Sequence, residues 1–331
     1  MADLYRLPRT IVPSHYDVTL EPDLTAFTFR GHGTVSITAA EPVTEIVLNS
    51  IELEIDRAWV EAVGGSRIDA IVSYDEPTER ATLALASELD AGEAVLHLEF
   101  RGILNGKLHG FYRSTFTGDD GRAHVIATTQ FEATDARRAF PCWDEPEAKA
   151  TFAITIVVDE GLTALSNAAE TAREPAGDGK VAVQFATTMK MSTYLVAFIV
   201  GPLEVTEPVD VDGTPLRVAH PLGKGALARF ALESDAFALR HFEDYFGLPY
   251  PADKLDLVAV PDFAFGAMEN LGCVTFRETA LLVDPARATQ AELQRVADVI
   301  HHEIAHMWFG DLVTIKWWNG IWLNEAFATF M

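Results

Sequence analysis

The alternation of apolar and polar residues along the first two hundred positions is the feature that most constrains the fold. Segments such as HYDVTLEPD and ATFAITIVVDEG place apolar residues at every second position, which is the period of a strand with one buried face. Glycine, proline and aspartate separate these segments, as turn residues do between short strands. The pattern predicts an antiparallel β-sandwich-like module. We expect the stretch EPAGDGK at 174–180 to be a loop.

The pattern changes after about residue 204. Residues 226–247 have the length and the leucine, alanine and glutamate content of a helix, and residues 254–263 read as a strand. Residues 289–310 form the clearest predicted helix. A last helix is predicted at 321–331, and it carries no stop signal.

The length of the chain favours more than one domain. It has 331 residues, of which 49% are hydrophobic, and this is long for a single core. We expect residues 1–203 to form an N-terminal β-sandwich-like domain and residues 204–331 to form a second domain that contains both helices and strands. Because the last helix has no stop signal, we expect the second domain to be incomplete.

The charge excludes some classes of partner. The formal net charge is −24, from 49 acidic and 25 basic residues. So acidic a surface repels phosphate backbones and anionic membranes, and it attracts cationic groups such as a free peptide amine. We therefore expect no nucleic-acid partner and no membrane partner.

Targeting signals and cysteines bear on the compartment. The N-terminal residues contain no apolar signal-peptide core, and no apolar run approaches the roughly 18 residues of a membrane span. The two cysteines, Cys142 and Cys273, are far apart and form no C-x-x-C motif. Unpaired thiols suit a reducing compartment, so we expect a cytoplasmic location.

Two histidines occupy the C-terminal half of the predicted helix 289–310, which opens with the capping-box pair Thr289 and Glu292. At about 100° per residue, His302 and His306 differ by about 40° around the helix axis. They lie roughly opposite an apolar stripe, so the helix is expected to be buried on both sides. The stripe consists of Leu293, Val296, Ile300, Ile304 and Met307. A single histidine is more often a core residue than a ligand, but H-E-x-x-H on a capped helix is typical of zinc peptidases.

The spacing suits zinc chemistry. Imidazole nitrogens bind zinc at about 2.0–2.1 Å, and a catalytic zinc needs a third protein ligand and one open position for water. Glu303, directly after the first histidine, could take a proton from that water. Eighteen residues separate His306 from Glu325, which is the candidate third ligand because its apolar neighbours disfavour an unpaired surface charge. The alternative is an ordinary exposed helix glutamate.

Three stretches of the chain resemble one known family. The zinc pattern above resembles that of the aminopeptidase N family of metallo-aminopeptidases. GAMENLG at 266–272 resembles that family's exopeptidase motif, and residues 129–152 resemble its N-terminal segment. The resemblance covers nearly the whole chain and is closest to the puromycin-sensitive type. It implies a saddle-shaped, antiparallel β-sandwich-like domain followed by a thermolysin-like α+β catalytic domain.

The resemblance also implies roles for individual residues. The implied ligands of one zinc ion per chain are His302, His306 and Glu325. Glu303 would be the general base of an aminopeptidase, and Glu132 and Glu269 would hold the free N-terminal amine of a peptide substrate. The other residues implied at the substrate site are Gln130, Gly266, Ala267, Met268 and Asn270. A peptide without the amine would leave two like charges unpaired, which is costly.

Other interpretations stay open. An epoxide hydrolase on the same scaffold would be expected to carry glutamine in place of Glu132, and an endopeptidase would not need paired acids for an amine. A binding protein with a decayed site is the third alternative. Read alone, Glu132 is an exposed strand-end residue, and Arg137 and Arg138 are surface charges or salt-bridge partners that brace the site.

The family's catalytic tyrosine and its remaining C-terminal part lie beyond Met331. We therefore expect the isolated fragment to bind zinc but to be weakly active or inactive.

Overall fold

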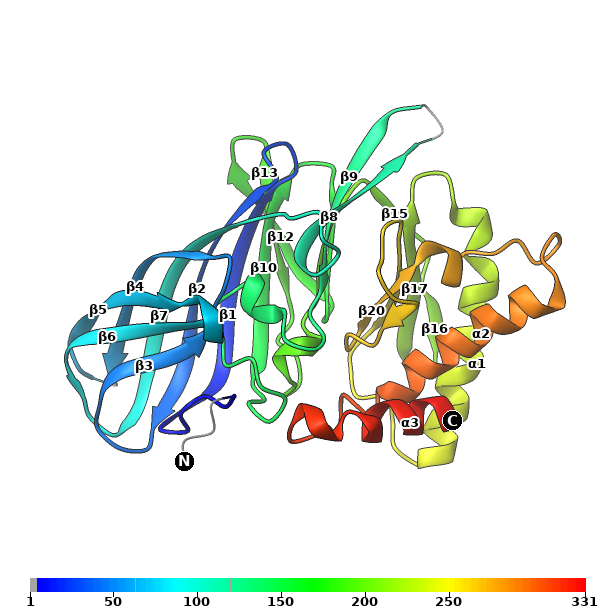
Figure 1. Cartoon of the computed structure of the whole chain (residues 1–331). Coiled ribbons are helices and arrows are strands. Elements are labelled where there is room, and N and C mark those ends of the chain that lie inside the picture. The colour runs from blue at the N-terminus through cyan, green and yellow to red at the C-terminus, as the bar shows by residue number, and fades with distance from the viewer. Residues whose placement is uncertain (1–4, 63, 119–120) are drawn as a thin grey trace.

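The computed structural model describes residues 5–331 except 63, 119 and 120. These residues form three β-sheets and three α-helices, with the helices gathered in the C-terminal part (Figure 1). Single 3-10 turns lie at Glu76–Thr78, Ala136–Arg138, Thr193–Leu195, Gly225–Leu227, Glu278–Ala280 and Trp318–Gly320.

The first sheet has ten strands and is built from the N-terminal half of the chain. In spatial order the strands are β12 (Glu170–Gly177), β13 (Lys180–Phe185), β10 (Thr151–Asp159), β1 (Ile11–Asp23), β2 (Thr28–Ala39), β7 (Gly92–Ile103), β4 (Glu54–Ala62), β5 (Arg67–Asp75), β6 (Arg80–Leu89) and β3 (Val43–Asn49). Its neighbouring strands run antiparallel, apart from β1 and β10, which run parallel with Tyr16 opposite Phe152.

A four-stranded sheet accompanies the first one. Its strands are β11 (Thr163–Ser166), β14 (Phe198–Gly201), β9 (Ala123–Gln130) and β8 (Gly110–Thr117). Buried aromatic rings from both sheets and their connections contact one another, mostly edge to face, although Tyr16 and Phe152 are stacked. The rings belong to Tyr16, Phe29, Phe111, Phe131, Phe140, Phe152 and Phe198. The β-sandwich-like N-terminal half predicted from the alternating pattern is therefore confirmed.

The third sheet belongs to the C-terminal half and is mixed. Its strands are β15 (Leu203–Val205), β17 (Thr214–Pro221), β18 (Leu255–Val260), β20 (Cys273–Arg277) and the edge strand β19 (Ala267–Met268), with β16 (Val209–Val211) paired to β17. The strands β17, β18 and β20 run parallel, and every residue of β18 is buried. Such strands need cover on both faces.

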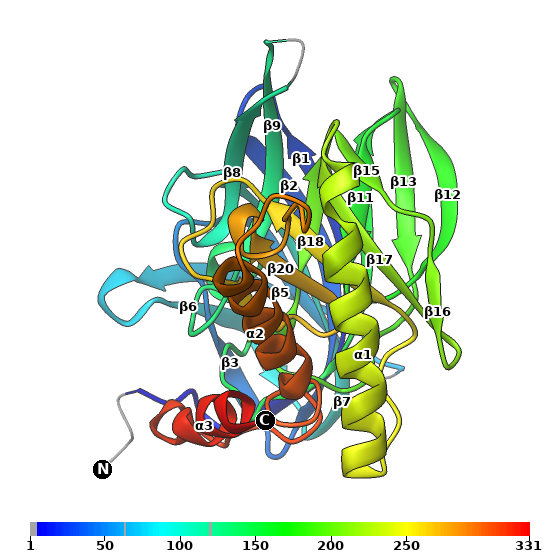
Figure 2. The ribbon, with the colours of Figure 1, turned by 90° about the vertical axis from the view of Figure 1, so that its right-hand side faces the viewer.

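Helices supply part of that cover. Helices α1 (Arg229–Phe246) and α2 (Gln290–His306) lie side by side against the third sheet, and α3 (Trp322–Phe330) crosses near the end of α2 (Figure 2). These three helices match the helices predicted at 226–247, 289–310 and 321–331.

One predicted loop is wrong. Residues 174–177 belong to β12, which pairs with β13 in a hairpin, so EPAGDGK is mostly strand. The turn itself comes at Asp178 and Gly179, where φ is 48° and 74°. Two successive residues with positive φ are what a tight hairpin turn requires, and Asp-Gly provides them readily.

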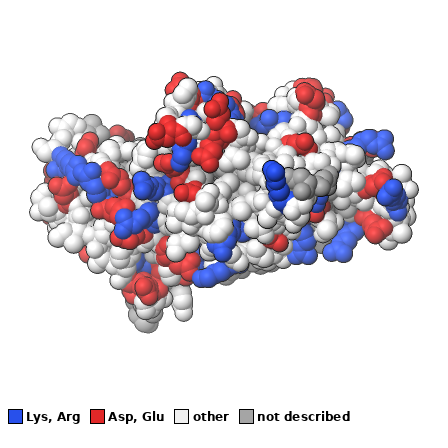
Figure 3. Space-filling model, turned by 90° about the horizontal axis from the view of Figure 1, so that it is seen from above, with Lys and Arg blue, Asp and Glu red and all other residues white. Residues whose placement is uncertain are grey.

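The surface of the described residues mixes both signs of charge. Seen from above, acidic and basic side chains are interspersed rather than separated into two fields (Figure 3). Within the described part of the chain, the helices are too short or too polar to cross a lipid bilayer.

The aromatic cluster gives a stability prediction. Phe140 is 1% exposed, and its ring centroid lies 6.1–6.5 Å from those of Tyr16, Phe131, Phe152 and Phe198. Because Phe140→Ala would leave a cavity between the sheets, we expect it to lower the free energy of unfolding by about 3–5 kcal/mol. Phe237→Ala, at a ring that is 63% exposed on α1, should change it by no more than about 0.5 kcal/mol. Denaturation in urea measures the free energy of unfolding of both variants. Equal losses of stability in the two variants would contradict a core centred on these rings.

Candidate active site

Helix α2 carries the two histidines. Its N-cap Thr289 accepts the N–H of Glu292, and the carboxylate of Glu292 accepts the N–H of Thr289, so the predicted capping box is present. The apolar stripe is buried at Val296, Ile300, Ile304 and Met307 and half-buried at Leu293. The helix ends at His306 rather than at the predicted Gly310. Gly310 has a φ of 146°, which no helix accommodates, and the residues before it fold into a turn.

His302 and His306 converge with Glu325 of α3, and these three side chains form one cluster. Their Nε2 atoms are 3.1 Å apart. The Nε2 atom of His302 lies 3.4 Å from Oε2 of Glu325, and that of His306 lies 3.7 Å from Oε1. Tetrahedral ligands at about 2.0–2.1 Å from a zinc ion lie about 3.3 Å from one another. The spacing and the chemistry of these three side chains therefore fit one tetrahedral zinc ion.

A backbone carbonyl fixes the ring of His306. Its Nδ1 atom lies 3.0 Å from the carbonyl oxygen of Phe309. Because a carbonyl can only accept, Nδ1–H is the donor, and the lone pair of the neutral ring is left on Nε2, facing the cluster. The Nδ1 atom of His302 similarly lies 3.5 Å from Oγ1 of Thr329. Both imidazoles thus present the same nitrogen to the cluster.

Three further carboxylates gather around the histidines. Single ligand atoms of Glu269, Glu303 and His306 lie within 4.8 Å of one another, and so do those of Glu132, Glu269 and Glu325. Burial raises the pKa of Glu303 well above its usual value, and the charge of Glu269 adds to the effect. Burial, with the charges of Glu269 and Glu325, raises the pKa of Glu132 to about 9. Like charges this close oppose ionisation unless a cation offsets them.

In the metal-free chain, the nearby carboxylates favour the protonated form of His306. Burial opposes a charge on His306, but Glu269, Glu325 and Glu303 outweigh it and hold the pKa of His306 well above its usual value. Hydrogen bonds from His302 and His306 lower the pKa of Glu325 to about 2. The cluster is therefore built for positive charge at its centre.

The turn that carries Glu132 is braced by two arginines. Arg137 is buried and donates from Nε to Oδ2 of Asp144 at 2.9 Å. Arg138 donates from Nε to Oδ1 of Asp135 at 2.6 Å. The interpretation of these arginines as plain surface charges is wrong, because both are ion-paired. Glu132 is half-buried and is not the exposed strand-end residue of the alternative reading.

The edge strand β19 borders the cluster. Gly266 and Ala267 line a cavity of about 700 Å³ together with His302 and Glu303. A Cβ atom placed on Gly266 would come no closer than 4.0 Å to a neighbouring side chain, that of Val299. The space over the backbone here is open. A peptide could therefore approach this edge closely.

The remaining predicted substrate residues, Gln130, Met268 and Asn270, are buried in or next to β19. Met268 is buried, and its sulfur accepts a hydrogen bond from Nε2 of Gln130 at 3.4 Å. Asn270 is buried and donates from Nδ2 to Oγ1 of Thr275 at 3.1 Å. These contacts hold the strand and its turn in place.

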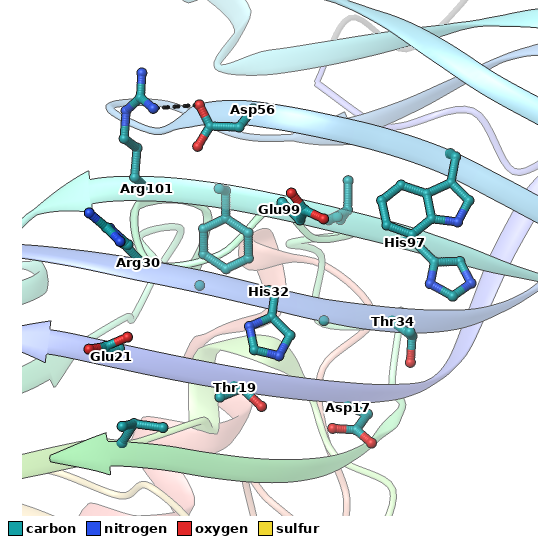
Figure 4. A pocket seen from close by; sticks show the side chains of 16 residues that line it. Asp17, Thr19, Glu21, Arg30, His32, Thr34, Asp56, His97, Glu99 and Arg101 are labelled. Atoms are coloured by element: carbon teal, nitrogen blue, oxygen red, sulfur yellow. Dashed lines mark hydrogen bonds and ion pairs between the residues drawn. The ribbon is translucent and has the colours of Figure 1, made fainter. Parts of the chain in front are cut away.

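A larger hollow, of about 850 Å³, lies on the outer face of the ten-stranded sheet, away from the cluster (Figure 4). Its labelled side chains are Asp17, Thr19, Glu21, Arg30, His32, Thr34, Asp56, His97, Glu99 and Arg101. Several are neutralised by neighbours, as Arg101 is by Asp56 at 2.6 Å and Glu21 by Lys180 at 2.5 Å. The hollow lacks the convergent ligands of the smaller cavity.

Sequence reasoning missed two buried side chains beside the cluster. Both carboxylate oxygens of Asp311 lack a hydrogen-bond partner among the described residues, and burial raises the pKa of Asp311 well above its usual value. An acid directly after Gly310 in an apolar run was the available signal. Tyr194 is also buried near the cluster, but it comes from a distant strand-like stretch and gave no signal.

The raised pKa of Glu132 gives a prediction for the metal-free chain. The folded state holds this proton up to about pH 9 and the unfolded state only to about 4.5, so the carboxyl lowers stability as pH rises between those values. Glu132→Gln should stabilise the chain by roughly 1–3 kcal/mol near pH 8 and by almost nothing near pH 5. Denaturant unfolding of chelator-treated protein at both pH values measures this. Glu160→Gln on an exposed loop is the control, and a gain independent of pH would contradict the burial of a protonated carboxyl.

Comparison with known proteins places this geometry in a family. The family model for the peptidase M1 N-terminal domain matches residues 12–195, and that for the peptidase family M1 domain matches residues 230–331.

Curated relatives resemble almost the whole chain. Aminopeptidase M1-C of Oryza sativa subsp. japonica is 44% identical over 98% of this chain and 37% of its own length. Alanine/arginine aminopeptidase of Saccharomyces cerevisiae is 45% identical over 98% of the chain and 38% of its own length. Puromycin-sensitive aminopeptidase of Caenorhabditis elegans is 43% identical over 98% of this chain and 35% of its own length. The chain spans less than two fifths of the length of these relatives, and it belongs to the peptidase M1 family.

Proposed function

We propose that this chain carries the metal site and the amine-binding site of a zinc aminopeptidase, which removes the N-terminal residue from peptides. The observation that carries the proposal is the convergence of two imidazole Nε2 atoms and Glu325 at zinc-ligand spacing, beside the three further carboxylates of Glu132, Glu269 and Glu303. The names of the relatives, all aminopeptidases, support the same reaction.

His302, His306 and Glu325 would hold one zinc ion per chain. When bound, zinc supplies Lewis-acid chemistry: it polarises the scissile carbonyl and makes water more acidic. Two neutral imidazoles and one carboxylate leave a position free for catalysis.

Glu303 acts as the general base. It follows the first histidine on α2, is 5% exposed, and approaches the cluster from the same helix face as His306. Its carboxylate accepts a proton from the attacking water and passes it to the leaving amine. In the metal-free chain the raised pKa of Glu303 favours the protonated form, and a dication in the cluster would favour the carboxylate that a base requires.

Glu132 and Glu269 bind the free amine of the peptide. Two carboxylates that repel each other are stabilised by one ammonium group, so peptides with a free amine bind preferentially. Holding the amine also places the first peptide bond of the substrate next to the metal. The backbone of Gly266 and Ala267 pairs with the extended peptide, with Met268 as a wall for its first side chain. Gln130 and Asn270 line this site and hold β19.

The proposal also includes the domain boundaries, the partners and the cellular location of the protein. Residues 1–203 form the N-terminal β domain, and residues 204–331 form a thermolysin-like domain that is completed by a further C-terminal part. The partners are peptides with a free amine, and the two free, buried cysteines suit a cytoplasmic location.

Zinc binding tests the ligand set. Purified chain dialysed against zinc should retain one ion, and Glu325→Ala should lower the affinity by more than about a hundredfold, since loss of an outer partner alone costs 10–100-fold. Glu303→Gln should keep the metal, because it removes no ligand. Zinc content by mass spectrometry with competing chelators measures both, and parent-like affinity in Glu325→Ala would overturn the proposed ligand set.

Amine recognition tests the peptide site. Zinc-loaded chain should bind a short peptide with a free N-terminus at least about tenfold more tightly than its N-acetylated form, because only the ammonium pairs with the two acids. Glu269→Gln should reduce this ratio, while Glu160→Gln should leave it unchanged. Calorimetric titration gives the ratio of the two affinities. Equal affinities of the parent chain for the free and the N-acetylated peptide would contradict the exopeptidase assignment.

A further inference from the structure

The turn that follows α2 is held by side chains from the N-terminal half of the chain. Lys149, just before β10, donates from Nζ to the carbonyl oxygens of Asp311 at 2.9 Å and Leu312 at 3.3 Å. Tyr194, in the 3-10 turn before β14, donates from its hydroxyl to the carbonyl oxygen of Gly310 at 3.2 Å. Three successive carbonyls of one turn are thus bound by residues more than 100 positions away in sequence.

The same turn orients His306. The carbonyl of Phe309 accepts the Nδ1–H of His306, and the carbonyl of His306 accepts the N–H of Asp311 at 3.1 Å. Gly310 packs directly on the ring, because a Cβ atom placed there would lie 3.1 Å from Nδ1 of His306. A displaced turn would therefore rotate the imidazole away from the cluster.

Tyr194 also reaches the segment that carries Glu325. Its hydroxyl accepts a hydrogen bond from Nδ2 of Asn324 at 3.4 Å, and both side chains are buried. One buried hydroxyl thus joins the turn after His306 to the residue before Glu325. A buried hydroxyl or amide that loses its hydrogen-bond partner is destabilising, so this bond resists movement of the two segments relative to each other.

We propose that Lys149 and Tyr194 are positioning residues of the metal site, through which the N-terminal half of the chain sets the orientation of His306 and the placement of Glu325. This inference rests on the proposed zinc site. It assigns the docked N-terminal sheets a direct part in metal affinity. Outer partners of metal ligands typically change affinity 10–100-fold when removed.

Zinc affinity of single variants tests the proposal. Lys149→Met and Tyr194→Phe should each weaken zinc binding about tenfold, and Lys149→Arg should restore most of it because arginine can still donate to both carbonyls. Matched controls are Lys190→Met, at an exposed lysine, and Tyr245→Phe, at a tyrosine that is 59% exposed on α1. Parent-like affinity in both test variants would overturn the proposal.

A double-mutant cycle separates positioning from general damage to the fold. If Lys149 acts through His306, the effect of Lys149→Met on the residual zinc affinity should vanish in a His306→Ala background. An effect that persists unchanged in that background, or an equal loss in the control variants, would show that the fold as a whole had weakened and would overturn the proposal.

A measurement without metal keeps the two proposals distinguishable. In the metal-free chain, the Nδ1 proton of His306 should exchange with solvent more slowly than that of the exposed His241, and Lys149→Met should accelerate this exchange at least about tenfold, as read from nitrogen-15 histidine spectra. A parent chain that binds no zinc would refute the proposed function alone. Unchanged exchange in Lys149→Met would refute the positioning role.

Discussion

Crowding of acidic side chains dominates the region where the N-terminal and C-terminal halves of this protein meet. Glu132, Glu269, Glu303 and Glu325 approach one another around two imidazoles, and Asp311 lies buried close behind. In the metal-free chain the raised pKa values of Glu132 and Glu303 and the protonated form of His306 relieve part of this repulsion, and the surrounding structure keeps the side chains close together. The capped helix α2, the braced turn of Glu132 and the short edge strand β19 each hold one side of this arrangement.

The N-terminal sheets therefore contribute side chains to the candidate site. Their aromatic rings form a rigid core, and segments at the edge of that core supply Glu132, Lys149 and Tyr194 to the cluster. In the proposed enzyme, the C-terminal half of the chain provides all three metal ligands, and the N-terminal half provides Glu132 of the amine site. The two halves are then parts of a single catalytic unit, although each has its own sheets.

Local patterns in the sequence predicted what depends on local physics. The capping box at Thr289, the stripe along α2 and the facing of His302 and His306 follow from helix geometry, and the structure has them as predicted. The resemblance to a family, rather than spacing, pointed to Glu132 and Glu269, and the structure brings both to the cluster.

Other features depend on contacts between distant segments and left no trace in the pattern. The parallel pairing of β1 with β10 joins residues that are over 130 positions apart, such as Tyr16 and Phe152, and an alternating pattern does not say which strand is the neighbour. The strand at 174–177 was hidden by glycine and proline. Arg137 looked like a surface charge because its partners Asp144 and Glu79 are recognisable only in the fold.

The brevity of β19 has a consequence for how the protein behaves among other chains. A long, flat edge strand would invite any unfolded segment to extend the sheet, which is the usual route to aggregation. The edge strand β19 has only two residues and ends before the buried Asn270, so another strand would find very little backbone to pair with. In the proposed enzyme, an edge this short would pair with only the first one or two residues of a peptide, and it would offer other chains too little backbone to extend the sheet.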